Sequence, residues 1–160
     1  MKKILLITAS LLASTAIVYA GGTHEGGHAD KMAVGKPGKS GHENRTIEIT
    51  MKETDDGDMI FEPNTLKVKK GETIRFIIKN AGELEHEFVL DSHKEIMKHK
   101  AVMEKFPEME HDDPNSVRLE EGKNGEVIWT FSNGGQFEFA CLIPGHYEAG
   151  MKGAIKVSTH

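Results

Sequence analysis

Short runs in which every second residue is apolar recur along most of this 160-residue chain. In one of them Ile47, Ile49 and Met51 alternate with polar residues. Side chains two residues apart lie on the same face of a β-strand, so each run predicts a strand with one buried face. Segments typical of turns, such as residues 55–58, separate the runs. The predicted strands cover residues 47–51, 66–68, 74–78, 87–90, 117–120, 126–131, 136–140 and 154–158.

Residues 92–106 break this period and follow a helical one instead. Ser92 is a good N-cap residue. Four apolar side chains fall within one arc of a helical wheel, namely Ile96, Val102, Met103 and Phe106. The pattern therefore predicts one short helix inserted between strands. About 115 residues, from 46 to 160, suffice for one hydrophobic core and not for two domains. We expect an all-β fold, an antiparallel sandwich of about eight strands with one helical insertion.

The first twenty residues have the charge and hydropathy pattern of a secretory signal peptide. Lys2 and Lys3 form a basic start, an almost uninterrupted apolar run covers residues 4–18, and residues 18–20 have the small-x-small sequence Val-Tyr-Ala. The apolar run is too short to span a bilayer well, and polar sequence follows it. We expect residues 1–20 to be removed on export, leaving a periplasmic protein with no membrane attachment.

Residues 21–45 have the composition of a flexible tail. Seven of these 25 residues are glycine, none is aromatic, and neither a strand nor a helix period is present. Burial therefore cannot offset the entropy of ordering this segment. The folded domain is expected to cover residues 46–160.

The charge balance excludes one class of partner. The chain carries 20 basic and 25 acidic residues, a formal net charge of -5. Removal of Lys2 and Lys3 with the signal peptide leaves 18 basic residues and a charge of -7. No nucleic-acid partner is expected, because binding nucleic acid requires a basic surface.

The residues that carry chemistry lie near the C-terminus, where Cys141, His146 and Met151 follow one another at steps of five. The segment between them is rich in proline and glycine, which predicts a loop. Cys141 is the only cysteine of the chain. In an oxidising compartment a lone thiol is prone to oxidation or intermolecular pairing unless something occupies it. A buried, inert cysteine is the alternative interpretation.

Strand parity directs this thiol toward the core. Phe137, Phe139 and Cys141 lie two residues apart, so the Cys141 side chain is expected to emerge at the strand end on the buried face. His86, just before another predicted strand, can supply an imidazole from a distant part of the chain. A thiolate, two imidazoles and a thioether are the ligand set of a mononuclear copper electron-transfer centre.

Copper fits this ligand set better than zinc does. Structural and catalytic zinc sites do not typically use methionine. Soft thiolate and thioether ligands suit Cu(I), and imidazoles also suit Cu(II). A trigonal set of His86, Cys141 and His146 with Met151 as a weak axial ligand can therefore serve both oxidation states.

From about Thr46 to its C-terminus the chain resembles the cupredoxins. The resemblance lies in residues 59–63 (Met-Ile-Phe-Glu-Pro), 71–74 (Gly-Glu-Thr-Ile), Asn80 and residues 137–141 (Phe-Glu-Phe-Ala-Cys). The Cys-x4-His-x4-Met spacing is similar to that of auracyanin and rusticyanin. Residues 103–115 and the Cys-Leu-Ile-Pro-Gly-His loop look closest to the periplasmic cupredoxins of bacterial copper-tolerance systems, the CopI type.

The resemblance implies a Greek-key sandwich that binds one type 1 copper ion per chain. The ligands that it implies are His86, Cys141, His146 and Met151. One position departs from the pattern. Many cupredoxins have Asn or Ser after the first ligand histidine, where it braces the cysteine loop, whereas Glu87 follows His86 here. An acidic group at this position would favour Cu(II) only if it faces the site.

The expected function is that of an exported copper-binding protein in copper tolerance or copper handling, with one-electron transfer chemistry at the copper. We expect a monomer whose partners are the copper ion and a redox or copper-handling protein that docks transiently. In the predicted tail, His24 and His28 lie four residues apart. They would hold a weaker accessory copper ion, or they belong to a solvated polar segment, and the sequence leaves both interpretations open.

One alternative is a different role for the same copper centre, and two others belong to other functional classes. A dedicated soluble electron carrier would expose the edge of His146 within an apolar collar formed by Leu142, Ile143, Pro144 and Tyr147. A copper enzyme is not expected, because multicopper oxidases and copper nitrite reductases need further histidine-rich centres and usually more than one such domain. A copper-free, adhesion-like sandwich would use Cys141 only as a core residue.

Overall fold

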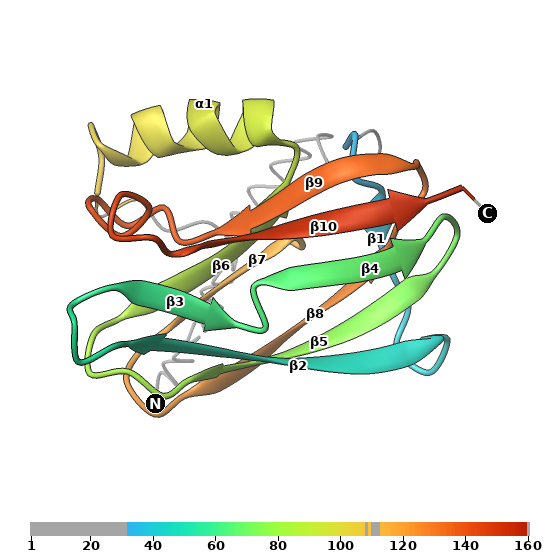
Figure 1. Ribbon diagram of the computed structural model, residues 1–160. Coiled ribbons are helices and arrows are strands. Elements are labelled where there is room, and N and C mark those ends of the chain that lie inside the picture. Colours follow the sequence, from blue (N-terminus) through green and yellow to red (C-terminus); the bar gives the residue numbers. More distant parts are fainter. Residues whose placement is uncertain (1–31, 108, 110–112, 160) are drawn as a thin grey trace, which may run out of the picture.

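The computed structural model describes residues 32–107, 109 and 113–159. The expected signal peptide at 1–20 and the beginning of the expected tail, with His24 and His28, lie outside the described residues. The described part is built from two five-stranded sheets packed face to face (Figure 1). The all-β sandwich with one helix predicted from the sequence is thereby confirmed.

The first sheet holds the strands in the order β1-β8-β5-β2-β3. Its strands are β1 (Lys36–Pro37), β2 (Arg45–Glu53), β3 (Met59–Glu62), β5 (Thr73–Asn80) and β8 (Asn124–Thr130). The β2–β5 pair is parallel, and the other pairs in this sheet are antiparallel. Alternate residues of β2 and β5 are buried, as their apolar period predicts.

The second sheet has the order β4-β10-β9-β6-β7. Its strands are β4 (Thr65–Lys69), β6 (His86–Asp91), β7 (Ser116–Leu119), β9 (Gly135–Ala140) and β10 (Lys152–Ser158). Here β4 and β10 run parallel to each other. Over the residues that the structure describes, the expectation of about eight antiparallel strands therefore needs correction to ten strands with two parallel pairs. The sequence pattern missed β1, whose two residues are too few to display an alternation, and β3, in which Met59, Ile60 and Phe61 are consecutive apolar residues and do not alternate.

The inner faces of the two sheets meet in an aromatic core. The ring of Phe139 stacks on Phe88 with a centroid distance of 5.4 Å and meets Phe61 edge to face at 5.1 Å. Phe76 on the first sheet approaches Phe88 at 5.7 Å. All four rings are at most 2% exposed. Side chains from both sheets thus interlock, which fixes the relative positions of the strand ends.

Residues 32–44 differ from the flexible tail expected for 21–45. Val34 is fully buried in the core, and β1 pairs antiparallel with β8. The backbone N–H of Gly38 donates to the carbonyl of Ile128 at 2.8 Å. One buried valine and a short ladder therefore attach this glycine-rich segment to the sandwich edge, a tertiary contact that local composition does not reveal.

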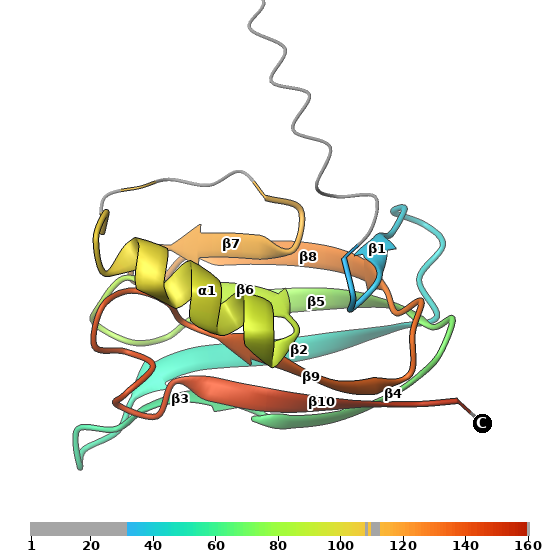
Figure 2. The same ribbon diagram turned by 90° about the horizontal axis from the view of Figure 1, so that it is seen from above.

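Helix α1 (His93–Met103) lies on the outer face of the second sheet against β6 and β9 (Figures 1 and 2). Ser92 caps it, since its side chain accepts from the N–H of Glu95 at 3.4 Å. Ile96 and Met103 are fully buried, as predicted. Val102 and Phe106 are exposed, which corrects their expected burial. The helix ends at Met103, so Phe106 lies beyond its packed face.

Among the described residues no helix combines the length and the hydrophobicity needed to cross a membrane.

Candidate metal centre

The four predicted ligand residues lie on or beside strands of the second sheet, near one end of the sandwich. His86 opens β6, Cys141 follows the last residue of β9, and His146 lies in the loop that leads to β10. Met151 immediately precedes β10. Figure 1 shows the β9–β10 loop and the connection between β5 and β6 at the same left-hand end. The sheet therefore brings together positions that are 55 residues apart between His86 and Cys141.

Three of these side chains converge on one point. The Nδ1 atoms of His86 and His146 are 3.2 Å apart, and the Sγ atom of Cys141 is 3.4 Å from Nδ1 of His146. Within the described part of the chain, this is the only group of three or more His, Cys, Asp or Glu side chains arranged to hold a metal ion, with ligand atoms within 4.8 Å of one another. His86 and Cys141 are fully buried, and His146 is 9% exposed.

Met151 is joined to the same group through its backbone. Its N–H donates to the carbonyl of His146 at 3.0 Å, and its carbonyl accepts from the N–H of Cys141 at 3.1 Å. Its side chain is fully buried and belongs to the core that contains Cys141. These two hydrogen bonds close the loop and keep the backbone of Met151 next to that of Cys141 and His146. The role of Met151 as a metal ligand stays a prediction.

While no metal is bound, the surroundings favour the thiol form of Cys141 and the neutral form of the His146 ring. Burial raises the pKa of the Cys141 thiol to about 12, although the N–H groups of Glu87 and Ile143 act in the opposite direction. Burial also lowers the pKa of His146, and the neighbouring His86 lowers it further. A metal ion must therefore displace the proton of Cys141, while His146 already favours the form that binds metal.

Glu87 keeps the bracing contact expected at its position. Its N–H donates to Sγ of Cys141 at 3.3 Å, and its buried carboxyl accepts from the N–H of Leu142. Burial raises the pKa of Glu87 to about 7, an effect that Arg118 opposes. The second carboxyl oxygen has no hydrogen-bond partner. At this position the backbone N–H of Glu87 contacts the cysteine sulfur, and its buried carboxyl is bonded to the N–H of Leu142.

Glu53, the last residue of β2, contacts the site from the opposite sheet. Its Oε1 lies 2.8 Å from Nε2 of His86. Burial acts to raise the pKa of Glu53, but backbone N–H donors, including those of Glu83 and Leu84, and the His86 ring outweigh it and keep this pKa below its usual value. The sequence analysis missed this residue. Its parity with Met51 on β2 was the available signal, because that parity points the side chain inward.

The donor set fits a first-row transition metal. Bonds of about 2.0 Å to two imidazole nitrogens at trigonal angles would place those nitrogens about 3.5 Å apart. The observed 3.2 Å between the Nδ1 atoms is close to that separation. One thiolate and two imidazoles form the trigonal donor set of blue-copper sites. The three groups that the sequence placed at the site are therefore compatible with copper in spacing and in chemistry.

A two-sheet sandwich with a His, Cys and His cluster at one end defines a cupredoxin. The family model of copper binding proteins, plastocyanin/azurin family, matches residues 48–158, and the chain belongs to this family. His86, Cys141 and His146 form its candidate copper site. The resemblance seen in the sequence is confirmed.

Relatives and solved structures agree with this assignment. The chain is 43% identical over 159 residues to the copper-resistant cuproprotein CopI of Rubrivivax gelatinosus, covering 96% of this chain and 94% of that protein. It is 36% identical over 169 residues to the copper-resistant cuproprotein CopI of Pseudomonas aeruginosa, covering 88% and 91%. The structure of auracyanin B shares the fold, with a TM-score of 0.62 and 21% identity over 78% of this chain and 96% of that one.

Proposed function

We propose that this protein binds one copper ion as a type 1 centre and acts in periplasmic copper tolerance or copper handling. The observation that carries the proposal is the convergence of one buried thiol and two imidazole Nδ1 atoms at the end of a rigid sandwich. His86, Cys141 and His146 would hold the ion, with Met151 as a weak axial ligand. We propose no enzymatic activity, because the described residues form a single sandwich with one such centre.

Copper held by these residues would supply a one-electron couple. The protein's contribution is to hold the donor atoms in place and to exclude water. His86, Cys141 and Met151 are fully buried, and the backbone bonds of Met151 close the loop beneath them. Ligands that are fixed by the fold change little in position between oxidation states, which favours rapid electron transfer. The ring of His146, at 9% exposure, is the most accessible part of the group.

Copper tolerance is supported by the names of the relatives, both of which are copper-resistant cuproproteins. The expected signal peptide supports a periplasmic location. In that compartment a protein that binds copper through a buried thiolate keeps the ion away from other thiols. The loaded protein would exchange electrons or copper with a partner that docks at the His146 end.

A dedicated electron carrier is the second candidate function, favoured by the surface around His146. Pro144 is exposed, and Ile143 and Tyr147 are half-buried, so an apolar rim is available for docking. Leu142 is 1% exposed and does not belong to this rim, which corrects the expected collar. It packs beneath helix α1 instead.

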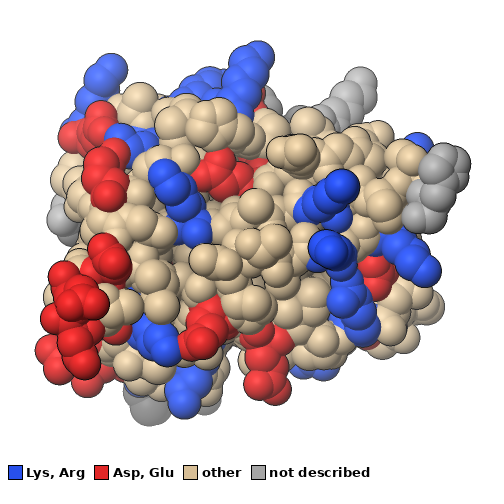
Figure 3. Space-filling model, viewed as in Figure 1, with Lys and Arg blue, Asp and Glu red and all other residues tan. Residues whose placement is uncertain are grey.

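The surface at this end of the sandwich is acidic. The turn between β2 and β3 carries the exposed residues Asp55, Asp56 and Asp58. Figure 3 shows acidic side chains gathered at the left-hand end, where this turn and the β9–β10 loop lie. A redox or copper-handling partner with a basic docking surface would complement it, and its association would weaken as salt rises.

Copper titration of the exported form tests the proposal. One tightly bound equivalent with an intense thiolate-to-Cu(II) charge-transfer band is expected, whereas a colourless loaded protein would contradict the type 1 assignment. Additional equivalents retained after a Cu(I) challenge and lost on deletion of residues 21–31, which removes His24 and His28 and keeps Val34 and β1, would support copper handling through the tail. Growth of a deletion strain on copper, measured beside its respiration, separates tolerance from electron transport.

Replacing Met151 by leucine is expected to leave copper bound and to raise the reduction potential. The thioether is a weak donor that favours Cu(II), so its removal stabilises Cu(I) in relative terms. A tenfold loss of Cu(II) affinity relative to Cu(I) corresponds to about 59 mV. Protein-film voltammetry measures this shift. Met103→Leu, a substitution of a buried methionine in the separate cluster beneath α1, is the control. Equal potentials in both variants would exclude an axial role for Met151.

A further inference from the structure

We propose that Glu53 is a positioning residue of the proposed copper site. It fixes the His86 ring with its proton on Nε2 and its Nδ1 lone pair facing the metal, and its charge favours oxidised copper. The inference rests on the proposed function, because it assigns a role to Glu53 only if copper binds at His86.

The tautomer follows from the chemistry of the contact. Oε1 of Glu53 and Nε2 of His86 are 2.8 Å apart, and His86 is fully buried. An ionised carboxylate can only accept hydrogen bonds, so Nε2 must carry the proton. In the neutral ring the Nδ1 atom of His86 then keeps its lone pair, which faces Nδ1 of His146 at 3.2 Å. The hydrogen bond from Nε2 to Glu53 thus orients the His86 ring so that Nδ1 is available to a metal ion.

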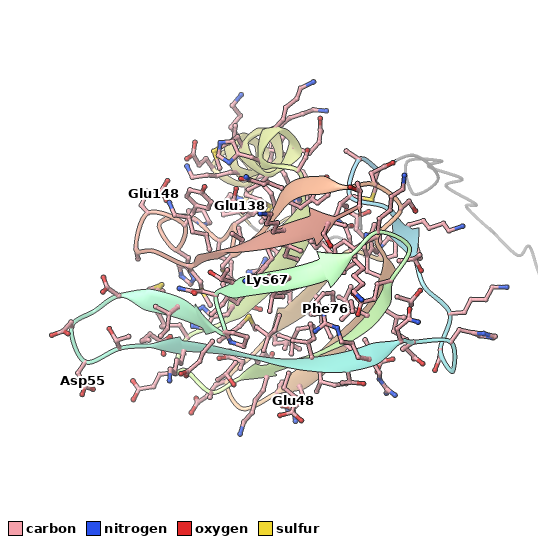
Figure 4. All side chains as sticks on the ribbon, turned by 45° about the vertical axis from the view of Figure 1, so that its right-hand side comes forward. Glu48, Asp55, Lys67, Phe76, Glu138 and Glu148 are labelled. Carbon is pink, nitrogen blue, oxygen red and sulfur yellow. The ribbon has the colours of Figure 1, made fainter. Side chains whose placement is uncertain are left out.

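Three N–H groups hold the Glu53 carboxylate in this orientation. Besides the His86 ring, the backbone N–H of Glu83 donates to Oε2 at 2.9 Å and that of Leu84 donates to Oε1 at 3.1 Å. These bonds join the end of β2 in one sheet to the loop that leads into β6 in the other. The side chain of Asp55, two residues farther along, points outward from the β2–β3 turn (Figure 4) and makes none of these contacts. Glu53 therefore belongs to the site and not to the acidic surface.

The loop is shaped to admit this carboxylate. A Cβ atom on Gly82 would come within 2.8 Å of Cδ and Oε1 of Glu53, a separation that real side chains essentially never show. Gly82 N–H in turn donates to the side-chain oxygen of Asn80 at 3.0 Å, which holds the loop in place. The space that another residue would fill at position 82 is occupied by the Glu53 carboxylate. A glycine at this point is what lets the loop close over it.

A charged acceptor on a ligand histidine has a defined electronic effect. It makes the imidazole a stronger donor and stabilises the higher charge of Cu(II) more than that of Cu(I). Loss of such a partner typically costs about 10–100-fold in metal affinity. Glu53 would therefore lower the reduction potential of the centre, in opposition to the burial of the site, which disfavours added charge.

Potentials of matched variants test this role. Glu53→Gln keeps the size and an acceptor oxygen but removes the charge, whereas Glu83→Gln removes a carboxylate from the exposed side of the same loop. We expect Glu53→Gln to lose about tenfold in Cu(II) affinity relative to Cu(I), a rise of about 59 mV. Glu83→Gln should stay close to the wild type. Gly82→Ala should shift the potential in the same direction as Glu53→Gln, because it displaces the carboxylate.

Nitrogen-15 NMR of the unsubstituted protein determines the tautomer of His86 directly, in the metal-free and the Cu(I) forms. A His86 Nε2–H resonance protected from exchange is expected in both. A proton on Nδ1 of His86 in the metal-free protein, or equal potentials for the wild type, Glu53→Gln and Glu83→Gln, would overturn the role of Glu53. Failure of the wild type to show the thiolate-to-copper band would instead overturn the copper site itself, so the two failures are distinguishable.

Discussion

Replacing Cys141 by serine is expected to abolish the intense charge-transfer band of the copper-loaded protein and to weaken copper binding by more than about 100-fold. That factor exceeds the upper range for loss of a hydrogen-bond partner behind a ligand, because here a ligand itself is removed. A serine hydroxyl is a hard donor that does not ionise at neutral pH, so it cannot replace a thiolate at a soft metal. Absorption spectroscopy and a competition titration with a copper chelator measure the two effects.

The metal-free Cys141→Ser protein should remain folded. The serine oxygen can still accept from the N–H of Glu87, which now donates to Sγ at 3.3 Å, so the change costs on the order of 1 kcal/mol. Ala140→Ser is the matched control, because it adds a hydroxyl at the neighbouring buried position and keeps the thiol. A Cys141→Ser protein that retains the band would refute the assignment of the thiolate.

The second large effect is expected from Phe139→Ala, which should lower the free energy of unfolding of the metal-free protein by about 3–5 kcal/mol. The Phe139 ring is fully buried and contacts Phe61 and Phe88 at centroid distances of 5.1 and 5.4 Å. A Cβ atom on Gly153 would lie within 2.5 Å of this ring, so β10 is packed directly against it. Alanine would leave a cavity between the sheets that these strands cannot close.

Urea denaturation of the metal-free variants measures this loss. Phe106→Ala is the control, since Phe106 is 57% exposed beyond the end of α1 and its removal should cost no more than about 0.5 kcal/mol. Because Phe139 lies two residues before Cys141 on the same face, copper binding should weaken together with stability. Similar losses for Phe139→Ala and Phe106→Ala would show that the aromatic core is not what holds the two sheets together.

Period-two patterns predicted the longer strands because burial of one face imposes that period. The pattern could not predict β1 (Lys36–Pro37), which exists through its pairing with β8 and the burial of Val34. It also could not show that β2 and β5 run parallel. Pairing direction depends on which strands become neighbours in three dimensions, and this information is spread over the whole chain.

The residues of the site also differ in how far the sequence could predict them. Cys141 and His146 were predictable because they lie in one short loop after a strand whose parity points inward. His86 was proposed from its position just before another predicted strand, and the resemblance to a family supported the same residue. Glu53 was not found, because a glutamate at the end of a strand is usually solvated. Its parity with Met51 and, in the structure, its contact with His86 across the two sheets distinguish it from its acidic neighbours.

The burial of Cys141 affects how its thiol reacts while no metal is bound. Oxidants attack exposed thiolates first, and this sulfur is both enclosed and protonated. The metal-free protein is therefore expected to resist forming a disulfide with another chain, even under oxidising conditions. Burial in the fold thus protects the sulfur of Cys141 from oxidation until a metal ion binds.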